Sequence, residues 1–223
     1  MGKYELVKPT ADLINQYDRI WKGDQTGDDF QVKLFEGVSV DIRKEPYNSI
    51  FKGLVENEKK INEYRRNNDV KGFLSELNRV YHTRLKTEEI AQAWFSEGFS
   101  LSPDTAKTVD DLVDLCGRKT NRHAYSFSTK VFNFIDPDKY PIMDKYVVNM
   151  LRAYGIEGIS AWGDYQKYTQ AYYMFKIQFE LKDFSYKKID QFLWTYAKLI
   201  ELYWQEEGVV LFNSTVTYQI KQK

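Results

Sequence analysis

The chain has 223 residues, and its 43% hydrophobic side chains supply enough apolar material for one domain or two small lobes. Its 32 Lys and Arg side chains balance 32 Asp and Glu, so no overall positive charge favours nucleic acid. A single cysteine, Cys116, excludes a disulfide and a four-cysteine zinc or iron–sulfur site, and two histidines argue against a histidine metal site. Without a membrane-length apolar run or the apolar stretch of a signal peptide, we expect a cytoplasmic protein.

The predicted elements of residues 1–100 are mostly helical, and we treat this stretch as an N-terminal region. Apolar residues recur at helical spacing over residues 9–22, 47–66, 69–81 and 87–97. Residues 30–42 instead alternate between apolar and polar, with Glu36 and Gly37 at the midpoint, which is typical of a small β-hairpin.

Residues 101–223 are predicted to form a second helical region. Ser102 and Pro103 resemble a helix start, and Gly117 resembles a helix stop. Further helices are predicted over 126–135, after Asp144, and near 161–181 and 185–206, and a weak strand over 209–220. The sequence therefore predicts a mainly α fold with minor β.

Lys130 lies at the edge of the apolar stripe of its predicted helix, beside Phe127, Val131 and Phe134. Burial beside aromatic rings, close to a helix start, disfavours the ammonium form and leaves a neutral amine for nucleophilic attack. An ordinary surface lysine, whose stem covers apolar surface, is the commoner explanation for such a position. Asp144 is predicted to be an N-cap, and the same position would hold its carboxylate ionised beside a developing positive charge.

A basic connector over residues 117–123 precedes the helix of Lys130. Backbone N–H groups at a helix start attract phosphate, so this segment is a candidate contact for the DNA backbone, although basic loops are also common solvated surface. The candidate phosphate contacts are Arg118, Lys119, Arg122, Ser126 and Thr129.

Two runs, Ser126–Phe134 and Tyr140–Asp144, resemble the helix-hairpin-helix DNA glycosylase superfamily, and the nearest branch is that of the 8-oxoguanine glycosylases and their compact bacterial relatives. The resemblance implies a two-lobed helical fold, with Lys130 as nucleophile and Asp144 as its assisting carboxylate. Three departures are visible: His123–Ser126 replaces the Gly-x-Gly turn, the spacing from lysine to aspartate is shorter, and the iron–sulfur cysteines of one branch are absent.

The function that this resemblance implies is excision of a damaged or modified base from double-stranded DNA after base flipping, with strand cleavage through a Schiff base. Phe134, Gln191 and Trp194 are candidate walls of the base pocket, although each alone is better explained by core packing. No cofactor and no metal are expected, and we expect a monomer that does not contact a membrane.

Three alternatives remain open from the sequence. The same scaffold could excise hypermodified bases such as those of phage DNA, or could be a helical DNA- or protein-binding module without catalysis. A metal-dependent nuclease would need an acidic cluster, and the candidates for it alternate with lysines like a solvated helix face. Those candidates are Asp104, Asp110, Asp111 and Asp114.

Overall fold

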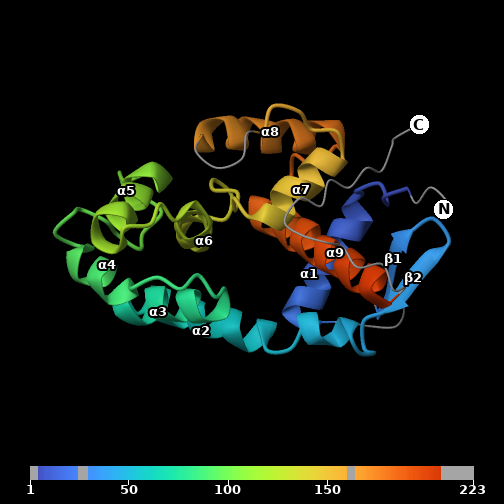
Figure 1. Ribbon diagram of the computed structural model, residues 1–223, viewed down its shortest axis with the longest axis horizontal. Coiled ribbons are helices and arrows are strands. Elements are labelled where there is room, and N and C mark those ends of the chain that lie inside the picture. The colour runs from blue at the N-terminus through green and yellow to red at the C-terminus, as the bar shows by residue number, and fades with distance from the viewer. Residues whose placement is uncertain (1–4, 25–29, 160–163, 207–223) are drawn as a thin grey trace.

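The computed structural model describes residues 5–24, 30–159 and 164–206, and over these residues it is mainly helical (Figure 1). Its α-helices are α1 (Ala11–Lys22), α2 (Leu54–Arg66), α3 (Val70–Val80), α4 (Thr87–Ala93), α5 (Val109–Thr120), α6 (Tyr125–Ile135), α7 (Lys145–Ala153), α8 (Tyr165–Gln178) and α9 (Tyr186–Glu206). No helix in this part of the chain is long and apolar enough to cross a membrane. The predicted class, mainly α with minor β, is confirmed.

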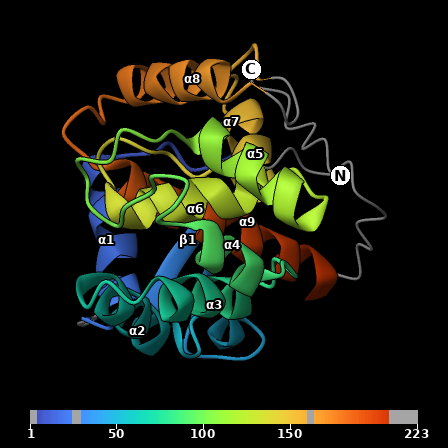
Figure 2. The same cartoon turned by 90° about the vertical axis from the view of Figure 1, so that its left-hand side faces the viewer.

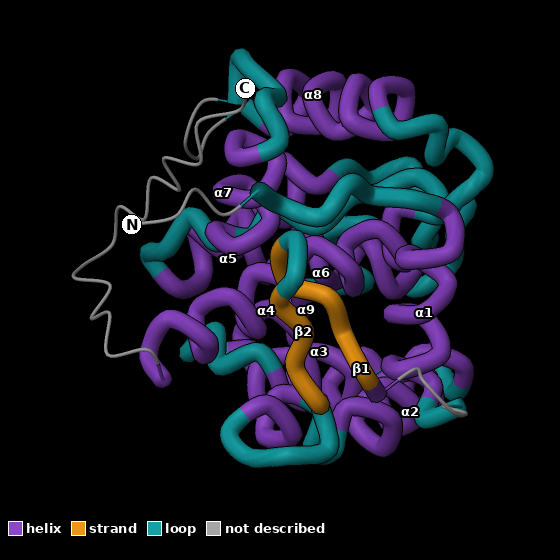
Figure 3. The backbone as a smooth tube through the Cα atoms, turned by 90° about the vertical axis from the view of Figure 1, so that its right-hand side faces the viewer, coloured by secondary structure: helices purple, strands orange, loops and turns teal. Residues whose placement is uncertain are grey.

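The predicted hairpin is confirmed as strands β1 (Gln31–Phe35) and β2 (Val38–Asp41). The strands pair antiparallel, with Val32 opposite Val40, and Gly37 takes the positive φ of 74° that the tight turn requires. The hairpin lies at the end of the molecule opposite α4 and α5 (Figures 1 and 3).

Two predicted helices in the first half are shorter than their periodicity suggests. Residues 47–66 do not form one helix, because a 3₁₀ helix, η2 (Tyr47–Ile50), is separated from α2 by Gly53 at a φ of 73°. Helix α4 ends at Ala93 and not at 97, since the chain turns there to bury Trp94 completely. In both cases a turn interrupts the helix within a run of helical periodicity.

The predicted bounds of α5 are wrong at both ends. The N-cap is Thr108 and not Ser102: the Thr108 hydroxyl accepts a hydrogen bond from Asp111 N at 3.2 Å, and Asp111 Oδ2 accepts one from Thr108 N at 2.8 Å. This reciprocal capping box satisfies two N–H groups that a helix start leaves free. The helix runs through Gly117 and ends at Thr120, and the C-cap Asn121 takes a left-handed φ of 55°.

The buried apolar side chains form two clusters, which we call the first core and the second core. The first core joins α1, the hairpin, α7, α8 and α9, and the second core joins α2 to α6. Figure 2 shows α3 to α6 on the face that belongs to the second core. Neither core begins or ends at residue 100, and the division of the chain into domains stays a prediction. The predicted strand over 209–220 lies outside the described residues.

Candidate active site

Lys130 lies in the middle of α6, and the residue is only 4% exposed. Its Nζ donates a hydrogen bond to Ser126 Oγ at 2.7 Å, one turn earlier on the same helix. It also lies 3.2 Å from Asp144 Oδ2 and 5.1 Å from the centre of the Tyr81 ring. Buried polar groups need partners, and here one carboxylate, one hydroxyl and one aromatic face surround the Lys130 amine.

Asp144 is the N-cap of α7, as the sequence predicts, and its two oxygens have different partners. Oδ1 accepts a hydrogen bond from Tyr146 N at 2.9 Å, which satisfies a free N–H of the first turn. Oδ2 faces Lys130. The cap therefore fixes the carboxylate in place, while its second oxygen remains available to the cavity.

The segment between α6 and α7 brings these two side chains together. Asn133 Nδ2 donates to Tyr140 O at 2.7 Å, and Thr129 Oγ1 accepts from Met143 N at 3.0 Å. From α8, Tyr165 donates to Pro141 O at 2.8 Å. This segment therefore runs along the side of α6 from the second core to the first, and its path places Asp144 beside Lys130.

The lysine and aspartate share a small cavity with all three predicted base-pocket residues, Phe134, Gln191 and Trp194. The cavity encloses about 20 Å³, room for about one water molecule. Phe134 packs edge-on against Phe73, and Trp194 packs edge-on against Trp21 with ring centres 6.1 Å apart. The structure thus brings together five residues that the sequence singled out from two distant segments.

The sequence reasoning missed Asp190 and Asn133, two buried polar side chains that line the same cavity. Asp190 Oδ1 and Asn133 Oδ1 have no hydrogen-bond partner within the described residues. Burial raises the pKa of the Asp190 carboxyl well above its ordinary value, with Asp144 raising it further and Lys130 lowering it. The shift favours the protonated form of this carboxyl, and the cavity holds it beside the amide oxygen of Asn133.

A signal for these two residues was present in the sequence. Asp190 stands beside Ile189 and Phe192 on the buried face of α9, where a carboxyl group is out of place. Asn133 likewise lies between two buried phenylalanines on α6. Tyr81, which covers the lysine, offers no such signal, because it follows α3 and reaches the cavity only through the packing of α3 against α6.

The predicted DNA-backbone residues are not all on the surface. Arg118 is exposed and pairs with Glu97 at 2.9 Å, Lys119 is exposed, and Arg122 donates to Arg84 O at 2.9 Å. Ser126 is half-buried against Lys130.

Thr129 is a correction to the predicted contacts. Its side chain is completely buried, and its hydroxyl donates to Tyr125 O and accepts from Met143 N. The residue therefore joins α6 to the segment before α7, and it presents no group to a phosphate.

The described residues contain no group of three or more His, Cys, Asp or Glu side chains that could hold a metal ion. Of the acids considered for a nuclease, Asp111 is occupied as part of the capping box of α5. No protein-family model matches the sequence, and no significant match was found among curated proteins or solved structures.

Proposed function

We propose that this protein is a DNA glycosylase with lyase activity that removes a damaged or modified base by attack of Lys130 on the sugar. One observation carries the proposal: a buried lysine amine lies 3.2 Å from a carboxylate in a cavity with aromatic and amide walls. An amine and a carboxylate at this distance can serve as nucleophile and as stabiliser of a cationic sugar.

The proposed reaction begins with Lys130 protonated and Asp144 ionised. As the bond between C1′ and the base breaks, the ionised Asp144 stabilises the positive charge on the sugar, and the Lys130 ammonium gives one proton to the departing base. The neutral amine then bonds to C1′. A proton passes from the bound nitrogen to O4′ as the sugar ring opens at the C1′–O4′ bond, which yields a protonated Schiff base. A base then removes a proton from C2′, and β-elimination breaks the C3′–O3′ bond.

The cavity walls support recognition of a flipped base. Phe134 and Trp194 offer aromatic faces, and Gln191, Asn133 and Asp190 offer hydrogen-bonding groups, which is the mixture that a planar polar ring requires. A cavity of about 20 Å³ is too small for a base, so binding requires its walls to separate. This proposed reaction uses neither a metal nor an organic cofactor.

The test is borohydride trapping on duplex DNA, which reduces the Schiff base to a stable adduct. Oxidised plasmid DNA and phage DNA with hypermodified bases are compared, because they separate the two substrate classes. We expect a covalent adduct with the unmodified protein and none with Lys130→Ala. Lys198→Ala is the matched control, since Lys198 is a half-buried lysine that bonds Tyr146 and Glu201 outside the cavity.

An adduct that persists in Lys130→Ala would refute the role of the lysine, and absence of excision from both DNAs would refute the glycosylase itself. A non-catalytic helical module is the second candidate, favoured by the complete pairing of Lys130 with Ser126 and Asp144. It predicts that Lys130→Met leaves DNA binding and every other activity unchanged.

A further inference from the structure

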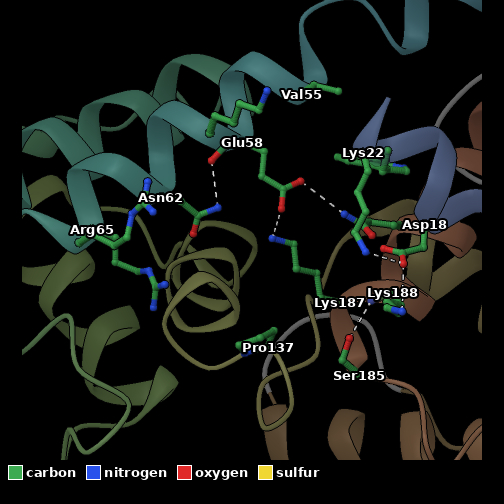
Figure 4. A pocket seen from close by; sticks show the side chains of 14 residues that line it. Asp18, Lys22, Val55, Glu58, Asn62, Arg65, Pro137, Ser185, Lys187 and Lys188 are labelled. Carbon is green, nitrogen blue, oxygen red and sulfur yellow. Dashed lines mark hydrogen bonds and ion pairs between the residues drawn. The ribbon is translucent and has the colours of Figure 1, made fainter. Parts of the chain in front are cut away.

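A second, larger cleft lies beside the lysine cavity and encloses about 560 Å³ (Figure 4). One wall is the face of α2 that carries Glu58, Asn62 and Arg65, and the opposite wall includes Pro137 and Lys187. Two carboxylates and six cationic side chains line the cleft. The cations are Lys22, Lys59, Arg65, Arg66, Lys187 and Lys188.

The carboxylates of the cleft are already neutralised. Asp18 Oδ2 lies 2.8 Å from Lys22 Nζ and 2.9 Å from Lys188 Nζ, and Glu58 pairs with Lys187. The three remaining cations, all from α2, have no carboxylate within 4 Å in the described part of the chain. The cleft is therefore positive, although the whole chain carries no net charge.

Arg65 lines the cleft, and its guanidinium is only partly satisfied by the protein. One of its terminal nitrogens donates to Ile135 O at 3.3 Å, which orients the guanidinium. Its Nε is buried and has no hydrogen-bond partner within the described residues. Because this Nε has almost no exposed surface, an anion in the cleft would contact the terminal nitrogens of the guanidinium instead.

The geometry points to a binding site for a phosphate-bearing nucleotide unit, either free or within a DNA strand. A volume of about 560 Å³ suits a ligand of that size. Arginine and lysine together match phosphate oxygens, and Trp21 in the wall offers an apolar surface to a base or sugar.

The cleft is distinct from the basic connector that the sequence singled out. Pro137, in the cleft wall, follows the C-terminal end of α6, whereas the connector precedes its N-terminal end, about 16 Å away along an 11-residue helix. The cleft and the lysine cavity share four wall residues, which are Trp21, Glu58, Lys187 and Gln191. The inference does not depend on base excision, because it rests on the cations of α2 and not on Lys130.

The experiment measures binding directly. Deoxyguanosine monophosphate and inorganic phosphate are titrated by calorimetry, and a short lesion-free DNA strand is titrated by fluorescence anisotropy. The test variant is Lys59→Gln with Arg66→Gln, since both side chains are exposed. The control, Lys8→Gln with Lys182→Gln, removes the same charge from two exposed positions outside the cleft.

We expect the cleft variant to bind at least one phosphate ligand about tenfold more weakly or worse, while the control binds like the unmodified protein. Loss of mononucleotide binding identifies a free nucleotide, and loss confined to the DNA strand identifies a DNA phosphate. Equal losses of affinity in the cleft variant and in the control would mean that only net charge matters, and would overturn the inference. So would the absence of binding by the unmodified protein. Either result leaves the trapping test at Lys130 unaffected.

Discussion

Replacement of Asp190 by asparagine tests the electrostatics of the cavity, because the two side chains have nearly the same shape. Burial raises the pKa of the Asp190 carboxyl well above the ordinary value of 3.8; Lys130 and Lys187 lower it and Asp144 raises it, without reversing the shift. The folded protein therefore favours the neutral carboxyl at pH values where the unfolded chain has it ionised. The amide that replaces it in Asp190→Asn is neutral in both states.

The sign of the pH dependence follows from this difference. Above the unfolded pKa and below the folded pKa, the folded state binds one proton more than the unfolded state. The contribution of Asp190 to stability is therefore complete below about pH 4 and is lost as pH rises, by about 1.4 kcal/mol for each pH unit. Because the introduced amide has no proton to release, Asp190→Asn becomes more stable relative to the unmodified protein by the same amount per unit.

The assay is urea unfolding followed by tryptophan fluorescence at pH 5, 6 and 7. We expect the difference in the free energy of unfolding between Asp190→Asn and the unmodified protein to grow across the series. Asp104→Asn, at an exposed position, serves as the control with a constant difference. A difference that stays constant for Asp190→Asn, or a variant that loses stability as pH rises, would mean that Asp190 is ionised in the folded protein.

Two further substitutions separate chemistry from structure. Asp144→Asn keeps a good N-cap for Tyr146 N but removes the charge beside Lys130. We therefore expect base excision to slow by about 10²–10³-fold. Adduct formation on DNA that already contains an abasic site should persist. An unchanged excision rate would remove Asp144 from the mechanism. Thr108→Ala breaks the capping box with Asp111 and should lower the free energy of unfolding, measured by a thermal melt, by about 1 kcal/mol. Base excision should be unaffected. An unchanged melting temperature would contradict the assignment of Thr108 as the cap.

The parts of the fold that local sequence specifies were predictable. The alternation around Gly37 predicts the hairpin, and Asp144 predicts the start of α7, because turn and cap chemistry act within a few residues. The start of α5 was misplaced because Ser102 precedes a proline, a pattern typical of helix starts, while Thr108 and Asp111 form the cap that is used. The two candidate caps, at Ser102 and at Thr108, are both local signals, and the sequence alone does not show which one starts the helix.

The candidate site was predictable only in part, for a physical reason. Lys130 and Asp144 lie on either side of one short connection, so their proximity follows from adjacent elements. Asp190 and Tyr81 reach the same cavity from α9 and from the end of α3, and only the packing of the two cores places them there. Thr129 was misassigned because its hydroxyl satisfies the backbone of a segment whose path the sequence does not specify.

The closed cavity limits where a base can enter under the proposed reaction. Lys130 and Asn133 belong to α6 in the second core, and Trp194 belongs to α9, which packs in the first core. Because the cavity lies between the cores, separation of its walls would move α6 and α9 apart at the boundary between the two cores. The ion pair between Glu58 on α2 and Lys187 on α9 spans this division, and both side chains are about one-quarter exposed. Exchanging a partly solvated ion pair for water costs little, so this pair opposes separation only weakly.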